Sequence, residues 1–279
     1  MTGGHETAFG ADRTYVTASV VKVAVLAALL LRAQDTGRWL TAEEEHLAAA
    51  MIERSDNDAA TTLRAAAGGV AGLDAAHARL GMPRTTAEPA WGLTRTTARD
   101  QLTLLKSVFG GASGPPVLNE GSRRFLAGLM GRVVPGQDWG VSAAAGGDPA
   151  GESAGESAGD PTGETAGGGW ALKNGWLPRT GSGLWVVHSV GLVRGRSTRQ
   201  ERDRPTGLGR DRSAGPERNR SAGPERNRSA EPVRDRSAGP VRDCLVAVLS
   251  DGHASLEEGI ARVEEAAVSA VRRAGHRSG

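Results

Sequence analysis

Apolar residues recur along the chain first with the period of helices and later with the pattern of β-strands. Between residues 17 and 133, apolar runs at helical spacing are separated by capping residues and glycines. These runs predict helices over 20–32, 41–54, 58–67, 70–80, 97–109 and 119–133. Shorter apolar and β-branched runs predict strands over 170–173, 184–193 and 244–249. After a turn at Asp251 and Gly252, a last helix has Leu256, Ile260, Val263, Ala267 and Val271 on one face.

This order of elements predicts an α+β fold, with a helical lobe inserted into a lobe built on an antiparallel sheet. The sheet lobe takes about residues 9–38 together with 170–279, and the helical lobe spans about residues 39–145. Residues 9–16 are the one part of the sheet that we expect before the helices, and they are predicted to form a short strand. The last two strands flank a long repeat, and we expect them to form an antiparallel hairpin.

Two stretches of tandem repeats interrupt this pattern. Residues 147–166 are five Gly-Asp or Gly-Glu tetrads, and residues 196–243 are Arg-rich octads. The tetrads have no residue larger than Glu and the octads have no aromatic residue, so we predict that both are disordered surface inserts. Removing these 20 and 48 residues leaves 279 − 68 = 211, which suits a single domain spanning residues 1–279.

The charge balance does not favour an anionic partner. The tetrads carry five acids, and the octads carry 13 Arg against eight acids, so the inserts cancel and the remaining residues keep 21 − 19 = +2. We expect a monomer that binds no nucleic acid. Binding of nucleic acid or cell-wall polymer by the octads is the weaker alternative, because acids interleave with the arginines and no aromatic side chain is available for stacking.

Several other classes of protein are disfavoured. The longest apolar run, Val23 to Leu31, is too short to span a bilayer. The first ten residues contain no basic stretch leading into an apolar segment, so no signal peptide is visible. Cys244 is the single cysteine, which rules out an internal disulfide, and the six histidines lack close ligand spacing, so we expect no metal site.

Three short motifs carry candidate chemistry. Ser19 and Lys22 lie three residues apart at a predicted helix start, where the helix N-terminus favours a developing oxyanion. Ser55, Asp56 and Asn57 follow the second helix, and Lys173, Asn174 and Gly175 lie on a strand. Each motif alone also has an ordinary interpretation: a chance pair on a helix, a helix cap, and a solvated charge at a sheet edge.

The lysine content adds weight to two of these motifs. The chain has 31 Arg but only three Lys, at positions 22, 106 and 173, and two of the three lie in the motifs. Arginine cannot be deprotonated in proteins, whereas the pKa of a lysine shifts readily on burial and the neutral amine can act as a base. Lys22 meets that requirement directly, and Lys173 needs only to be a compact cation.

Taken together, the order of the three motifs resembles the serine β-lactamase and penicillin-binding-protein superfamily, most closely class A β-lactamases, whose signature motifs are S-x-x-K, S-D-N and K-T-G. The resemblance implies that Ser19 is the nucleophile of an acyl-enzyme and Lys22 its proton acceptor. It implies that Ser55 relays a proton to the leaving nitrogen and that Asn57 holds Lys22 and the amide of the substrate. The chemistry requires no cofactor.

The third motif departs from the family pattern. The resemblance assigns attraction of the substrate carboxylate to Lys173, and the oxyanion hole to the backbone N–H groups of Ser19 and Trp176. Asn174 stands where the family has Thr, so that a hydroxyl contact to substrate becomes an amide. Trp176 follows Gly175 where a small residue is usual. Its ring either crowds the pocket or forms an apolar lid on the helical lobe.

A second departure concerns the loop that carries the deacylating glutamate in class A enzymes. Glu88 and Pro89 begin the corresponding segment here, but the following asparagine is missing and the loop is several residues shorter. Glu88 is therefore the candidate deacylation base, and an ordinary exposed carboxylate is the alternative. The first helix and first strand of the family also have no counterpart before Phe9. We expect that either the start codon is misplaced or the sequence is a fragment of a longer protein.

The resemblance favours a class A β-lactamase that opens β-lactams through an acyl-enzyme on Ser19. One alternative is a D-alanyl peptidase or transpeptidase of the penicillin-binding-protein type, which deacylates slowly. A non-catalytic binding scaffold is the other. The resemblance also predicts an extracytoplasmic location, with retention in the cytoplasm as the alternative.

Overall fold

The structure is a computed structural model of the protein, and it describes residues 6–111, 114–145, 169–195 and 243–276. The predicted tetrad insert lies outside these residues, as does the octad insert except for Asp243. The elements are β1 (Thr14–Val16), η1 (Ala18–Val20), α1 (Val21–Asp35), α2 (Ala42–Glu53), α3 (Asn57–Ala66), α4 (Gly69–Arg79), η2 (Trp91–Leu93), β2 (Arg95–Thr97), α5 (Ala98–Phe109), α6 (Glu120–Met130), η3 (Val141–Ala145), β3 (Trp170–Pro178), β4 (Trp185–Val193), β5 (Cys244–His253) and α7 (Leu256–His276).

The helices of the helical lobe begin where capping residues predict. Thr41 and Glu44 form a reciprocal capping box at the start of α2. Asp56, Thr97 and Asn119 accept backbone N–H groups at the starts of α3, α5 and α6. Helix α1 is buried on nearly every side, as its continuous apolar sequence predicts, and forms the centre of the main hydrophobic core. The predicted helix over 119–133 is shorter in the structure, because α6 ends at Met130.

Strands β3, β4 and β5 form one antiparallel sheet, which confirms the predicted hairpin of the last two strands. Two of the strands are longer than their apolar runs predict. β3 continues to Pro178, which pairs with Trp185. The predicted turn at Asp251 and Gly252 is wrong: both lie within β5, where Asp251 pairs with Val186 across a register irregularity. Pairing to β4 therefore extends the strand past the point where its apolar pattern stops.

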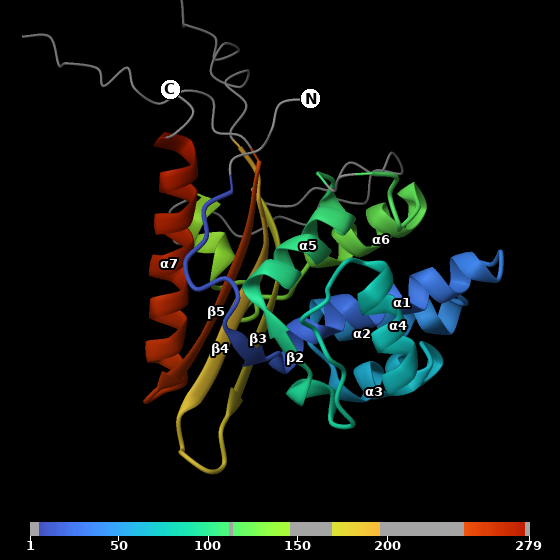
Figure 1. Ribbon diagram of the computed structural model, residues 1–279, viewed down its shortest axis with the longest axis horizontal. Coiled ribbons are helices and arrows are strands. Elements are labelled where there is room, and N and C mark those ends of the chain that lie inside the picture. Colours follow the sequence, from blue (N-terminus) through green and yellow to red (C-terminus); the bar gives the residue numbers. More distant parts are fainter. Residues whose placement is uncertain (1–5, 112–113, 146–168, 196–242, 277–279) are drawn as a thin grey trace, which may run out of the picture.

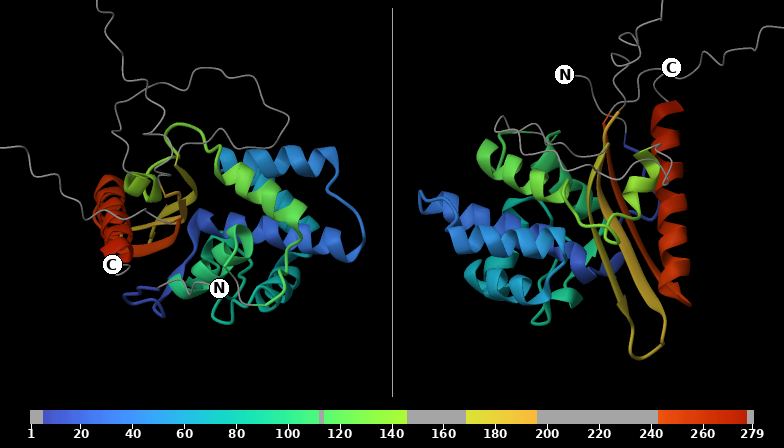
Figure 2. Two further views of the ribbon diagram at one scale, coloured as in Figure 1. Left: turned by 90° about the horizontal axis from the view of Figure 1, so that it is seen from above. Right: turned by 180° about the vertical axis from the view of Figure 1, so that it is seen from behind.

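The sheet lies between α7 and the helical lobe, as Figures 1 and 2 show. Val263 and Ala267 of α7 are fully buried, on the face that the helical period predicts. Gly259 lies so close to the sheet that a Cβ there would come 2.3 Å from Val187 Cγ2. This architecture confirms the predicted α+β class. Among the described helices, none has both the length and the apolar character required to cross a bilayer.

The segment before α1 differs from the prediction. Only Thr14–Val16 forms a strand, and this strand pairs with β2 instead of extending the three-stranded sheet. Phe9, which was expected to begin the strand, is fully exposed.

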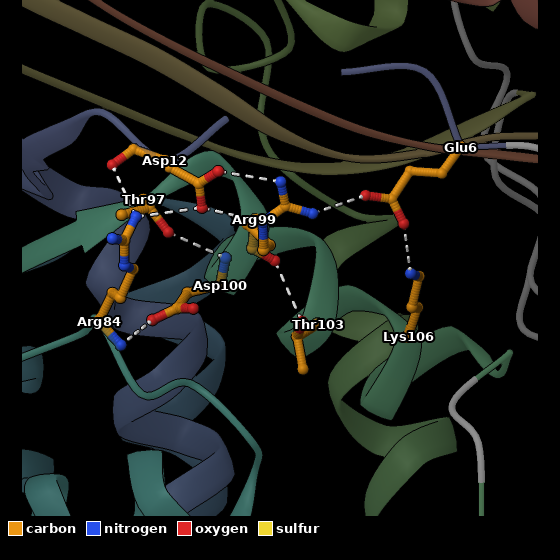
Figure 3. A network of polar contacts seen from close by, with 8 residues as sticks. All are labelled: Glu6, Asp12, Arg84, Thr97, Arg99, Asp100, Thr103 and Lys106. Carbon is orange, nitrogen blue, oxygen red and sulfur yellow. Dashed lines mark hydrogen bonds and ion pairs between the residues drawn. The ribbon is translucent and has the colours of Figure 1, made fainter. Parts of the chain in front are cut away.

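Ion pairs tie the residues before β1 to α5, as Figure 3 shows. Asp12 accepts two hydrogen bonds from Arg99 and also pairs with Arg84, while Glu6 pairs with Arg99 and Lys106. These side chains are 35–55% exposed, so each pair contributes little stability by itself.

The packing of α7 on the sheet yields a test of the fold. We expect Gly259→Val to lower the free energy of unfolding by about 1–3 kcal/mol, because the added atoms must displace Val187 or the helix. Ala266→Val, at an exposed position of the same helix, introduces the same β-branched residue without that collision and serves as the control. Urea unfolding of both variants measures the difference, and equal stabilities would contradict the close packing.

Candidate active site

Lys22 brings the first two predicted motifs together. From the first turn of α1, its ammonium Nζ donates to Ser55 O at 2.6 Å, Ser55 Oγ at 3.2 Å and Asn57 Oδ1 at 2.8 Å. The Lys22 side chain is fully buried. Asn57 begins α3, and Ser55 has a left-handed φ of 58° in the link between α2 and α3. The tight link therefore turns the side chains on either side of Asp56 towards the same ammonium group.

Lys173 reaches the same hydroxyl from the sheet. Its Nζ donates to Ser55 Oγ at 3.0 Å and to Asn174 O at 3.0 Å. Only 1% of Lys173 is exposed, so the interpretation of this residue as a solvated charge at a sheet edge is wrong. Residues from α1, the α2–α3 link and β3 thus meet at one oxygen atom, and they come from all three predicted motifs.

Ser19 lies at the centre of η1, directly before α1. Neither η1 nor α1 has a side-chain cap, so the Ser19 hydroxyl does not cap the helix that it precedes. The preceding residue, Ala18, has a left-handed φ of 46°, which costs an L-residue about 1–3 kcal/mol. Within the described part of the chain, no hydrogen bond joins Ser19 Oγ to Lys22, although their spacing places both at the same helix start.

Gly175 lets the β3 backbone approach the Ser19 backbone. A Cβ at Gly175 would lie 2.8 Å from Ser19 N and 2.7 Å from Val20 N, which no side chain permits. Trp176 is the next residue along β3.

Asn174 and Trp176 contact the segment between α6 and η3. The Asn174 amide donates to Gln137 O at 2.8 Å and Trp139 O at 2.9 Å, and only 1% of the residue is exposed. The Trp176 ring is half-buried and lies 5.8 Å from the Trp139 ring, centroid to centroid. The amide of Asn174 therefore holds its own protein backbone, and the Trp176 ring contacts the Trp139 ring.

The two lysines have lowered pKa values. Burial lowers the pKa of Lys22 from 10.5 to about 8, and the charge of Asp56 opposes this shift only in part. The Trp91 ring, 5.0 Å from Lys22 Nζ, contributes to its enclosure. Burial also holds the pKa of Lys173 well below its usual value, and the nearby charge of Lys22 lowers it further. Each lysine is thus poised to lose its proton more readily than a lysine in water.

Glu88 lies in a loop whose backbone is firmly anchored. Arg64 of α3 donates to Glu88 O at 3.0 Å and to Pro89 O at 2.8 Å, and Glu88 N donates to Thr94 Oγ1 at 3.3 Å. The half-buried Glu88 carboxylate makes no hydrogen bond to Ser19 or Lys22 within the described residues. The fold therefore fixes the path of this loop but does not join its carboxylate to the polar network.

Sequence patterns did not indicate two residues of this site, Trp91 and Arg64. Trp91 encloses Lys22, and Arg64 clamps the loop by its carbonyl groups. Neither residue belongs to a motif. Arg64 binds backbone carbonyl oxygens, which every residue has, so no partner side chain in the sequence indicates this contact. Among the described residues, no group of three or more His, Cys, Asp or Glu is arranged to hold a metal ion.

Comparisons with known proteins show which family model and which folds the chain resembles. A family model described as "Beta-lactamase enzyme family" matches residues 40–134, which include α2 to α6. No curated protein matches the chain. A solved class A β-lactamase from Bacteroides cellulosilyticus is 14% identical over 96% of this chain and 87% of its own, with a TM-score of 0.61.

Two further solved structures have the same fold. A β-lactamase from Burkholderia vietnamiensis is 21% identical over 95% of this chain and 85% of its own, with a TM-score of 0.58. PBP-A is 18% identical over 95% of this chain and 84% of its own, with a TM-score of 0.56, and a mutant of it is known as an acyl-enzyme complex with penicillin G. These likenesses show that the chain has the fold of class A β-lactamases and PBP-A, and the family model matches residues of its helical part.

The lowered lysine pKa values are directly measurable, because the chain has only three lysines. With lysine labelled by ¹³C at the ε position, we expect one NMR signal to titrate near pH 8, because burial disfavours the charged form of Lys22. Below pH 8 this amine is mostly protonated, and above pH 8 it is mostly neutral. Lys22→Arg should remove that signal alone. Titration of all three lysines above pH 10 would contradict the enclosure of Lys22 and Lys173.

Proposed function

We propose that the protein is a serine hydrolase of the class A β-lactamase type, which opens β-lactams through an acyl-enzyme on Ser19. The observation that carries this proposal is the sharing of Ser55 Oγ by Lys22 and Lys173, next to the close approach of Gly175 to Ser19. Buried amines on both sides of one hydroxyl form a path for protons around a reacting centre. A purely structural core would gain no stability from two buried cations.

The acylation step follows from these positions. Neutral Lys22 accepts the proton of the Ser19 hydroxyl, and Ser19 Oγ then bonds to the carbonyl carbon of the β-lactam. The N–H groups of Ser19 and Trp176 bind the oxyanion that forms. The ring C–N bond then breaks, and Ser55 passes its proton to the leaving nitrogen and regains one from the protonated Lys22. The products of this step are an ester on Ser19 and an opened ring with an N–H. Asn57 orients Lys22 and the substrate amide.

Lys173 completes the substrate site. It attracts the substrate carboxylate and also holds Ser55 Oγ in place. Asn174 contributes differently from the threonine of the family pattern, because among the described residues both hydrogen bonds of its side chain go to backbone carbonyls. We therefore assign it the task of holding the segment beside the site, whereas the family's hydroxyl would contact substrate.

Glu88 is the proposed base for deacylation. Its loop leads into Trp91, whose ring lies 5.0 Å from Lys22 Nζ, and this proximity supports the assignment. Arg64 donates to the carbonyl oxygen of Glu88, and Thr94 accepts from the Glu88 N–H, so the loop is held from two directions. A water molecule activated by Glu88 would attack the ester carbonyl carbon and release Ser19.

A second candidate function is a D-alanyl peptidase or transpeptidase of the penicillin-binding-protein type. The absence of a hydrogen bond from the Glu88 carboxylate to Ser19 or Lys22 among the described residues favours it, because the acyl-enzyme would then persist. A non-catalytic binding scaffold is the third, and the Trp139–Trp176 contact beside the site is the observation that favours it. For the enzymatic functions we propose action on small β-lactams or cell-wall peptides, as a monomer outside the cytoplasm.

Mass spectrometry of the intact protein distinguishes these functions. After incubation with penicillin G, we expect an adduct of the full antibiotic mass on Ser19 that then disappears through hydrolysis, and no adduct on Ser19→Ala. The acylation rate should rise as the pH passes through about 8, because Lys22 becomes neutral there. A stable adduct would identify the penicillin-binding type, and no adduct on either protein would exclude both enzymatic functions.

The role of Glu88 is tested by Glu88→Gln. We expect acylation within about threefold of wild type and deacylation slower by about 10²–10⁴-fold, because a general base is lost without a change in shape. Glu265→Gln, at an exposed position of α7, removes one carboxylate far from this loop and is the matched control. Unchanged turnover of a chromogenic cephalosporin by Glu88→Gln would rule out this carboxylate as the base.

A further inference from the structure

His188 is a fully buried histidine that the proposed mechanism does not use. It lies in β4, and both of its ring nitrogens have backbone partners. Its Nδ1 lies 3.1 Å from Ser250 N of β5, and its Nε2 lies 2.8 Å from Val16 O of β1. One imidazole ring therefore connects two strands of the sheet to the segment that leads into Ser19.

These partners determine the tautomer of the ring. Ser250 N–H is a donor, so Nδ1 must be the unprotonated acceptor. Val16 O is an acceptor, so Nε2 must carry the proton. The ring is neutral in this arrangement, which agrees with the effect of burial, since burial lowers the pKa of His188 to about 4. His188 thus acts as a fixed donor to Val16 under ordinary conditions.

The bond from His188 lies next to the strained part of the nucleophile segment. Val16 lies two residues before Ala18, whose left-handed conformation must be maintained by contacts on both sides. Thr17 N donates to Thr94 O at 2.8 Å on the side of the Glu88 loop. His188 supplies the contact on the side of the sheet.

His188 also pairs, across the sheet, with the glycine that allows the Ser19 backbone to approach β3. It is the register partner of Gly175, whose missing Cβ leaves room for the Ser19 and Val20 amides. The turn η1 packs on both β3 and β4 at this point. The hydrogen bond to Val16 and the close approach at Gly175 therefore attach the same turn to the same part of the sheet.

We propose that His188 is a positioning residue of the candidate active site, whose Nε2–H holds Val16 to the sheet and thereby sets the position of Ser19 relative to the Trp176 N–H. This inference rests on the proposed function for its kinetic consequence. A displacement of about 1 Å at a reacting centre lowers a rate by about 10²-fold. Loss of the bond should therefore slow acylation more than it weakens substrate binding.

Two substitutions distinguish the donor from the ring. His188→Phe keeps an aromatic ring but has no donor, and His188→Gln replaces the ring but retains an N–H group on a side chain of similar reach. His253→Phe is the matched control, because His253 bonds to Ser250 Oγ on the same sheet and makes no hydrogen bond to Val16 among the described residues. Acylation by penicillin G is followed by time-resolved intact-mass spectrometry at several concentrations.

We expect His188→Phe to lower the saturating acylation rate about 10–100-fold, with the half-saturating concentration within about threefold of wild type. His188→Gln should recover the rate to within about fivefold, and His253→Phe should match wild type. A packing role predicts the opposite order, with Phe above Gln. That order, or a wild-type rate in His188→Phe, would overturn the proposal.

A second measurement is independent of catalysis. In ¹⁵N NMR of the wild-type protein we expect His188 to carry its proton on Nε2, and amide exchange at Thr17 and Val20 to be faster in His188→Phe. If the wild type forms no adduct, the proposed function fails while these measurements still decide the positioning role. A proton on Nδ1, or unchanged exchange in a folded His188→Phe, would reject it. If the variants do not fold, the wild-type tautomer decides alone.

Discussion

The shared hydroxyl of Ser55 is the contact on which the rest of the site depends, because two buried ammonium groups approach it from elements far apart in the sequence. Lys22 comes from α1 and Lys173 from β3, and neither forms an ion pair with a carboxylate among the described residues. The charge of Asp56 raises the pKa of Lys22 only in part, and the Asp56 side chain is already engaged as the cap of α3. Burial therefore outweighs attraction, and the pKa values of both lysines fall.

This balance explains why the helical lobe and the sheet must meet at a fixed distance. Lys22 also requires Ser55 O and Asn57 Oδ1, which only a tight link between α2 and α3 places together. On the other side, Gly175 allows β3 to lie against the Ser19 amide. A shift of either lobe would leave a buried ammonium without acceptors, and such a group is far more costly than a surface charge.

Local sequence predicted much of the framework because its signals are local. Thr41, Thr97 and Asn119 are capping residues whose partners lie three positions along the chain, and the structure has these caps. The buried helix α1 followed from a continuous apolar run. The ends of β3 and β5 were mispredicted, because Pro178 and Asp251 are held in strands by pairing with β4 and not by their own preferences.

By itself, the sequence determined the helices, the core strands and the three motifs, since periodicity, caps and residue type act over a few neighbouring positions. Only the tertiary structure decided how the motifs are used. It placed Lys173 in the interior, engaged the Asn174 amide with backbone carbonyls and held Val16 through His188. The physical reason is that burial and hydrogen-bond partners come from segments far apart in the chain, so the pKa of a lysine or the tautomer of a histidine is a property of the packed lobes.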